Sequence, residues 1–74
     1  MQLEREINLN KLAGYRVMLG FNQENFGKLL GITKQSYGQK ENGKRDFTDS
    51  EKKKLKEYLI TFFPEVSYEE LFFN

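Results

Sequence analysis

Two amide side chains and one ammonium group share a side of the segment from residue 33 to residue 42. At 3.6 residues per helical turn, Lys34, Gln35 and Gln39 project from the same polar face. Glutamine can hydrogen-bond to adenine through both of its polar groups, and lysine can donate to the acceptor atoms of guanine. Gly38 removes a side chain midway along this face, which would let the helix approach the floor of a DNA groove. These four residues are the candidate base contacts.

The same face also fits a simpler interpretation, because solvated helix surfaces are generally rich in glutamine and lysine. Two flanking segments favour contact with nucleic acid. Asn22 and Gln23 stand at the expected start of the preceding helix, where unpaired N–H groups and the helix dipole attract phosphate. Asn42, Lys44 and Arg45 follow the polar segment, where backbone amides and two cations can hold the opposite phosphate backbone. These five residues are the candidate phosphate contacts.

Arg16 is a charged residue within an apolar stripe. It follows Leu12 by four residues and precedes Leu19 by three, which places all three on one face of a helix over residues 10–19. A partly buried guanidinium needs a partner. Glu41, at the end of the polar segment, can accept two parallel hydrogen bonds from it. The alternative is that Arg16 extends its charge to water along its aliphatic stem.

Capping residues and glycines predict three short helices in the first part of the chain. Each helix begins at a side chain that can cap it and ends near a glycine. The caps are Asn10, Asn22 and Thr33, and the glycines are Gly20, Gly31 and Gly43. The second helix is expected to bury Phe26, Leu29 and Leu30.

Two further helices are expected after the third. Thr48 and Glu51 have the spacing of a capping box, and Pro64 prevents their helix from continuing. Ser67 and Glu70 repeat that spacing at the start of a brief fifth helix. The expected inner residues of these two helices are Leu55, Tyr58, Leu59, Phe62, Leu71 and Phe72. The chain is therefore expected to be one all-α domain over residues 10–74, preceded by an extended arm over residues 1–9.

The composition excludes several classes of site. The 74 residues include no cysteine and no histidine, which rules out a disulfide framework and disfavours a zinc centre. No apolar run approaches the roughly 20 residues needed to span a bilayer, and the first six residues do not resemble a secretion signal. We therefore expect a cytoplasmic chain with no metal, no cofactor and no membrane partner.

Charge placement bears on the class of function. The net charge is +1, which is weak support for a polyanion partner. Between residues 33 and 45, however, four bases accompany one acid, Glu41; the bases are Lys34, Lys40, Lys44 and Arg45. Glu69 and Glu70 are adjacent rather than opposed, and no residue has the surroundings of an activated nucleophile. We expect no enzyme activity and no small-molecule substrate.

Seven residues between positions 20 and 45 form a recognisable pattern. A Gln opens the second helix, a small residue lies midway through it, a Gly and an aliphatic residue form the turn, and Glu-Asn-Gly ends the third helix. Here these are Gln23, Gly27, Gly31, Ile32, Glu41, Asn42 and Gly43. The pattern resembles the Cro/C1-type (XRE) helix-turn-helix family of phage and bacterial repressors, over roughly residues 12–47 and more loosely elsewhere.

The resemblance implies a compact five-helix, lambda-repressor-like DNA-binding domain with its helix-turn-helix over residues 22–42. The implied base contacts are Lys34, Gln35 and Gln39, the implied phosphate contacts are Asn22, Gln23, Asn42 and Lys44, and the implied buried pair is Arg16 with Glu41. The implied function is that of a homodimeric transcriptional regulator, a repressor of phage or mobile-element type. It would bind a near-palindromic double-stranded operator and read the major groove with residues 33–41.

Three residues depart from the family pattern. Gly27 stands where alanine is usual and would cost roughly 1 kcal/mol of helix stability. Lys40 replaces an aromatic or aliphatic residue, so its stem is expected to pack while its charge reaches water. Asp46 stands where proline is common, and it adds a negative charge beside the expected phosphate contacts.

Two alternatives stay open in the sequence. Phe72 and Phe73 are the candidate dimer contacts, but closing the core of a monomer fits them equally well. The alternative function is a protein-interaction module of the same fold, antitoxin-like or a regulator-binding subunit. Such a module would use its aromatic C-terminal helix against a protein partner, and the near-neutral charge favours it slightly.

Overall fold

Side-chain caps begin every helix in the part of the chain that the structure describes. The computed structural model describes residues 10–73, and each cap accepts a hydrogen bond from the backbone N–H three residues on. The caps are Asn10, Asn22, Thr33, Thr48 and Ser67. All five were predicted, because capping depends on residues close in sequence. A second complete capping box, between Asn22 and Asn25, was not predicted.

The predicted all-α fold is confirmed. The five helices are α1 (Lys11–Met18), α2 (Gln23–Leu30), α3 (Lys34–Glu41), α4 (Asp49–Ile60) and α5 (Tyr68–Phe72). No strand occurs between residues 10 and 73, and no helix in that range is long and apolar enough to cross a membrane. The expected arm over residues 1–9 lies outside the described residues.

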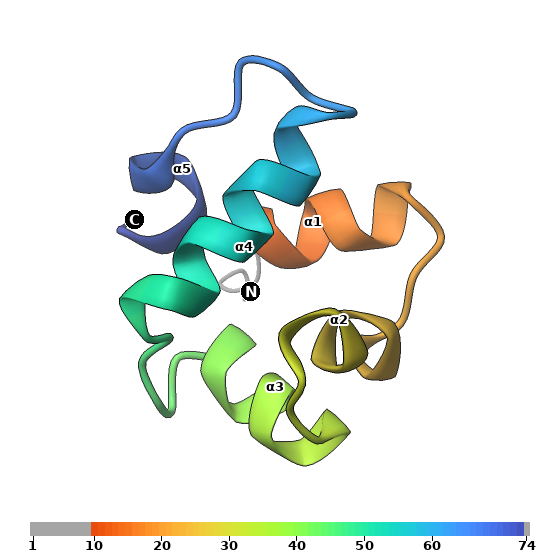
Figure 1. The fold of residues 1–74 in the computed structure, drawn as a ribbon, viewed down its shortest axis with the longest axis vertical. Helices are drawn as coiled ribbons and strands as arrows, with labels where there is room; N and C mark the ends of the chain where they lie inside the picture. The colour runs from red at the N-terminus through yellow and green to blue at the C-terminus, as the bar shows by residue number, and fades with distance from the viewer. Residues whose placement is uncertain (1–9, 74) are drawn as a thin grey trace, which may run out of the picture.

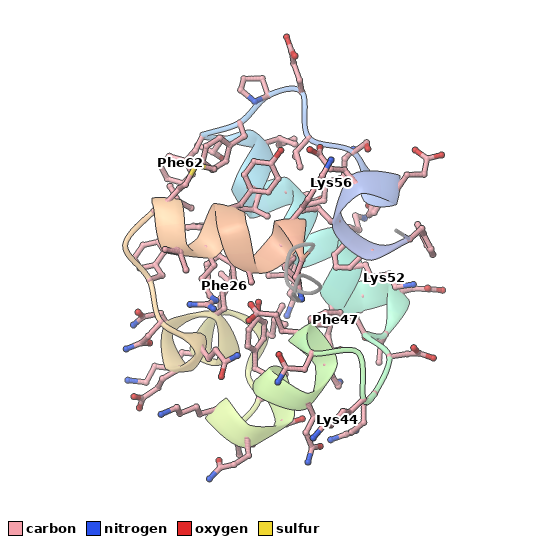
Figure 2. All side chains as sticks on the ribbon, turned by 180° about the vertical axis from the view of Figure 1, so that it is seen from behind. Phe26, Lys44, Phe47, Lys52, Lys56 and Phe62 are labelled. Atoms are coloured by element: carbon pink, nitrogen blue, oxygen red, sulfur yellow. The ribbon has the colours of Figure 1, made fainter. Side chains whose placement is uncertain are left out.

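The helices form two groups (Figure 1). α1 and α4 cross near the middle of the molecule, which Figures 1 and 2 show from opposite sides, and α5 packs beside both. α2 and α3 lie together at one end. Gly31 joins them in a left-handed conformation with φ of +75°, which residues with a Cβ rarely adopt. α2 and α3 are therefore a tightly connected pair that the other helices support.

The centre of the core lies where α2, α3 and α4 meet. Phe26 of α2 packs edge-to-face against Tyr37 of α3 and Tyr58 of α4, with ring centroids 5.9 and 6.1 Å apart. Leu55 and Leu59 of α4 are fully buried. Burial of each such side chain contributes about 1.5–3 kcal/mol, so the inner face of α4 fixes the α2–α3 pair from behind.

Aromatic residues close the other end of the core. The rings of Phe47 and Phe72 lie 5.5 Å apart, and Phe72 is partly buried against the core. Phe73, by contrast, is 60% exposed. The two residues that the sequence treated together therefore differ: Phe72 closes the monomer, whereas Phe73 projects from it.

The prediction that Phe62 lies on the inner stripe of α4 is wrong. Phe62 is 48% exposed, and the neighbouring Phe63 packs instead against Tyr15 of α1, with ring centroids 4.7 Å apart. Because α4 ends at Ile60, the helical spacing from which the stripe was inferred no longer applies at residue 62. The Tyr15 hydroxyl also donates to Glu70 Oε2 at 2.7 Å, which ties α5 to α1.

Candidate nucleic-acid interface

The outer side of α3 carries three exposed polar side chains. Lys34, Gln35 and Gln39 are all exposed, as the sequence predicts, whereas Tyr37 on the inner side is fully buried. Amide and ammonium groups on an exposed helix can both donate hydrogen bonds, and the amides can also accept them. This side of α3 therefore offers a row of polar groups with no large apolar residue among them.

Gly38 does not belong to this exposed row, and the expectation that it opens the row to a groove floor is wrong. The residue is buried, and a Cβ built there would lie 3.0 Å from Oε1 of Gln23. The side chain of Gln23 lies over the bare backbone because α2 packs closely on α3 at this point. The missing side chain of Gly38 makes room for Gln23, not for a ligand.

Lys40 is also turned inward, so the expectation that its charge reaches water is wrong. The residue is only 8% exposed, and its ammonium donates to both carboxylate oxygens of Glu51, at 2.7 and 2.9 Å. Glu51 Oε1 also accepts from the backbone N–H of Thr48. Burial alone would raise the pKa of Glu51, but the hydrogen bonds from Lys40 and Thr48 outweigh it and lower the pKa. The pair attaches α3 to α4.

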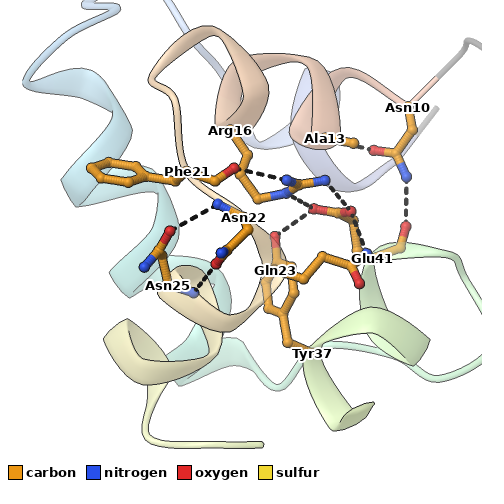
Figure 3. A network of polar contacts seen from close by, with 9 residues as sticks. All are labelled: Asn10, Ala13, Arg16, Phe21, Asn22, Gln23, Asn25, Tyr37 and Glu41. Atoms are coloured by element: carbon orange, nitrogen blue, oxygen red, sulfur yellow. Dashed lines mark hydrogen bonds and ion pairs between the residues drawn. The ribbon is translucent and has the colours of Figure 1, made fainter. Parts of the chain in front are cut away.

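The predicted pair between Arg16 and Glu41 is confirmed (Figure 3). Arg16 Nε donates to Glu41 Oε2 at 2.9 Å, and Nη2 donates to Oε1 at 3.1 Å. Arg16 Nη1 donates to the backbone oxygen of Phe21 at 2.9 Å. The guanidinium is thus held on several sides by protein atoms. The alternative, in which Arg16 extends to water, is excluded.

Two more donors reach the same carboxylate. Gln23 Nε2 lies 3.0 Å from Glu41 Oε1, and the Tyr37 hydroxyl lies 2.8 Å from Oε2. Asn10 Nδ2, from the cap of α1, donates to the backbone oxygen of Glu41 (Figure 3). Residues from α1, α2 and α3 therefore converge on Glu41, and we call Arg16, Gln23, Tyr37 and Glu41 the Glu41 network.

The Glu41 network keeps one negative and one positive charge in a nearly dry site. Burial alone would raise the pKa of Glu41, but hydrogen bonds from Arg16, Gln23 and Tyr37 outweigh it and lower the pKa. The hydrogen bond to Glu41 raises the pKa of Arg16, and burial raises the pKa of the Tyr37 hydroxyl. The carboxylate and guanidinium stay ionised and the phenol stays neutral, so the network holds the inner side of α3 at fixed distances.

The start of α2 matches part of the prediction. Asn22 is exposed, but its side chain is engaged in the capping box with Asn25. The amide nitrogen of Gln23 is engaged with Glu41. What remains for a phosphate at this end is the set of N–H groups in the first turn of α2, together with the positive end of its dipole. Glu24, which is exposed in the same turn, opposes an anion there.

The segment after α3 folds back onto the exposed row. Asn42, Lys44 and Arg45 are all exposed, and the N–H groups of Lys44 and Arg45 donate to the backbone oxygen of Gln39. Arg45 Nη1 lies 3.2 Å from Ser36 Oγ and 3.4 Å from Gln39 Oε1. Arg45 therefore joins the α3 row, while Lys44 projects at the α3 end of the molecule (Figure 2).

Ser36 is a member of the row that the sequence analysis missed. It is half-buried, and its hydroxyl receives the guanidinium of Arg45. Its place three residues before Gln39 was the available signal, since residues three apart are neighbours on a helix surface.

The chain has no match among known proteins in three comparisons. No family model, no curated protein and no solved structure matches it. Among the described residues, no group of carboxylates is arranged to hold a metal ion. The case for a function therefore stands on the α3 row and its supports.

Proposed function

We propose that the chain is a sequence-specific regulator that binds double-stranded DNA through a lambda-repressor-like domain and reads the major groove with α3. One observation carries the proposal: Lys34, Gln35 and Gln39 form an exposed polar row on a helix whose other side is fixed by the Glu41 network. Base recognition needs donors and acceptors at set positions, and each well-made bidentate contact discriminates by about 1–3 kcal/mol.

The flanks of the row suit the two phosphate backbones that border a groove. The first turn of α2 lies on one side, and Asn42 and Lys44 follow α3 on the other. Phosphate contacts set the register and orientation of a protein on the duplex, while base contacts specify sequence. Arg45 acts within the row itself, where it holds Gln39 and Ser36 and supplies a cation at the base edges.

A regulator of this kind acts as a repressor by occupying an operator, and two copies bind two half-sites. Half-sites on one face of DNA lie about 34 Å apart, which is one helical turn. The chain measures 35 × 28 × 23 Å, so two copies side by side can place their α3 helices at this spacing.

Selection of bound sites from a random pool of duplex DNA, followed by binding curves at several salt concentrations, tests the proposal. Gln39→Ala should relax the preference at one base pair of the selected site and cost about 1–3 kcal/mol there. Lys44→Ala should weaken binding to all sequences and reduce the salt slope by about 1. Lys53→Ala, which removes an exposed lysine from α4, is the matched control and should change neither. Absence of any DNA retention at low salt would refute the proposal.

A protein-interaction module is the second candidate, and exposed apolar side chains favour it. Val17, Met18 and Phe62 are all exposed, and Figure 2 shows Phe62 at the end of the molecule opposite Lys44. This surface is separate from the α3 row. Recovery of one protein partner at a fixed stoichiometry, by a chain that retains no DNA at low salt, would select this candidate instead.

A further inference from the structure

We propose that a groove bordered by α5, the start of α4 and the segment between α3 and α4 binds a second copy of the chain. The groove has a volume of about 600 Å³. Phe47, Leu71 and Phe72 line its apolar part, and Phe73 stands on its edge. Its volume is within the range of about 300–1,000 Å³ that holds a whole small ligand, so the groove admits large side chains of a partner.

Phe73 is the side chain that fits this groove. Its ring is 60% exposed, and it lies on the same surface as the hollow beside it. A twofold dimer brings the same patch of both copies together. Each Phe73 can then enter the groove of the other copy, where an aromatic anchor in an apolar pocket carries much of the binding energy.

Charges on the rim of the groove are complementary to themselves across a twofold axis. Asp46 and Lys52 both line the groove, and neither makes an ion pair with another described residue. The ammonium of Lys52 lies 4.7 Å from the ring centre of Phe73, so it stands beside the inserting side chain. In the dimer, Asp46 of each copy faces Lys52 of the other, and the pair occurs twice. Asp46, which departs from the family pattern, thereby acquires a role.

The groove adjoins the proposed DNA-binding surface, because Asn42 and Arg45 line it too. A dimer formed there holds the two α3 helices in a fixed relation to each other. The inference depends on the proposed function only for this orientation on DNA. The dimer itself forms, or does not, in the absence of DNA.

Sedimentation equilibrium of the full chain without DNA, over a range of concentrations, tests the dimer. The wild-type chain should associate to a dimer, and Phe73→Ala should raise the dimer dissociation constant by about tenfold or more. Phe62→Ala, which removes an exposed ring that does not line the groove, is the matched control and should leave the constant unchanged. Circular dichroism should show the same helix content in both variants. A wild-type chain that stays monomeric, as it would if residues 1–9 of the same chain filled the groove, overturns the inference.

A charge exchange tests the pairing. Asp46→Lys and Lys52→Asp should each weaken the dimer, because like charges then face each other twice, and the double variant should restore it. Glu57→Lys makes the same charge change as Asp46→Lys at an exposed position outside the groove, and it should have no effect. A double variant that is weaker than both single variants would contradict the Asp46–Lys52 pairing.

DNA binding separates this inference from the proposed function. The monomeric Phe73→Ala variant should keep the wild-type preference for a single half-site and lose cooperative binding to paired half-sites. If the wild-type chain forms the dimer but binds no DNA, the proposed function fails and the dimer stands. If it binds DNA with no change on Phe73→Ala in either assay, the dimer surface is wrong and the proposed function stands.

Discussion

The two halves of the molecule are joined in different ways. α1, α2 and α3 meet through hydrogen bonds to one buried carboxylate, that of Glu41. α4 and α5 meet through aromatic rings and the lysines beside them: Lys52 lies near Phe73, and Lys56 lies 4.7 Å from the ring centre of Tyr68. Hydrogen bonds to a charged group depend on distance and angle, whereas ring packing tolerates small shifts.

This difference matches what each half has to do. A helix that reads bases must be held close to one position, since displacement of its polar groups breaks their hydrogen bonds. A helix that closes a core needs only to keep water out. Substitutions in the two halves should therefore differ in size and in how far their effects spread.

The largest effect is expected from Glu41→Ala. The change leaves the buried guanidinium of Arg16 without its carboxylate, and the free energy of unfolding should fall by about 3–5 kcal/mol. Urea denaturation measures the loss. Glu57→Ala, which removes an exposed carboxylate, should stay within about 0.5 kcal/mol of wild type. A loss below about 1 kcal/mol for Glu41→Ala would mean that the network does not hold the three helices.

Leu71→Ala should have the next largest effect, and a local one. The change removes buried apolar volume under α5, and we expect a loss of about 2 kcal/mol, at the low end for such substitutions because a five-residue helix near the chain end can relax. Hydrogen exchange should show lost protection in α5 and unchanged protection in α3. Equal loss of protection in both helices would show that the two halves are not independent.

Two glycine substitutions should have opposite signs, each of about 1 kcal/mol. At Gly14 a new Cβ meets nothing within 4 Å, so Gly14→Ala should stabilise α1 by raising its helix propensity. At Gly27 the Cβ would lie 2.9 Å from the backbone oxygen of Ile32, so Gly27→Ala should destabilise the α2–α3 turn. Thermal unfolding of the two variants gives the comparison. Stabilisation by both would show that the turn can yield.

The smallest effect is the pH dependence that Glu41 contributes. Its pKa is lowered in the folded chain, so its stabilisation is fully present above the unfolded value near 4.5 and is lost as the pH falls through the folded value. Between pH 6 and pH 4 the loss should be less than about 1 kcal/mol, with most of it below pH 4. The difference between wild type and Glu41→Gln in urea unfolding at each pH isolates this contribution. A wild-type chain that gains stability relative to Glu41→Gln on acidification would reverse the assigned direction.

The sequence predicts features that depend on near neighbours or on a strong physical requirement. The cap at Thr48 follows from the identity of Glu51 three residues later, and both bonds are present. Arg16 was matched to Glu41 across 25 residues because a guanidinium in an apolar stripe requires a carboxylate, and a single acid stands at the right end of α3.

The sequence does not predict features that depend on which side chain lies above a given position. Gly38 falls on the polar side of α3 by helical spacing, yet Gln23 of another helix covers it. Lys40 resembles a surface lysine, yet α4 brings Glu51 to it. Both errors concern the border between the two sides of α3, where a neighbouring helix decides whether water has access.

The eight residues of α3 divide cleanly between anchoring and display. Tyr37, Gly38, Lys40 and Glu41 are spent on contacts with other helices, and Lys34, Gln35 and Gln39 make none of the buried bonds. Such a helix is a natural scaffold for a library: the three displayed positions can be randomised together while the thermal stability of the variants stays close to that of the parent.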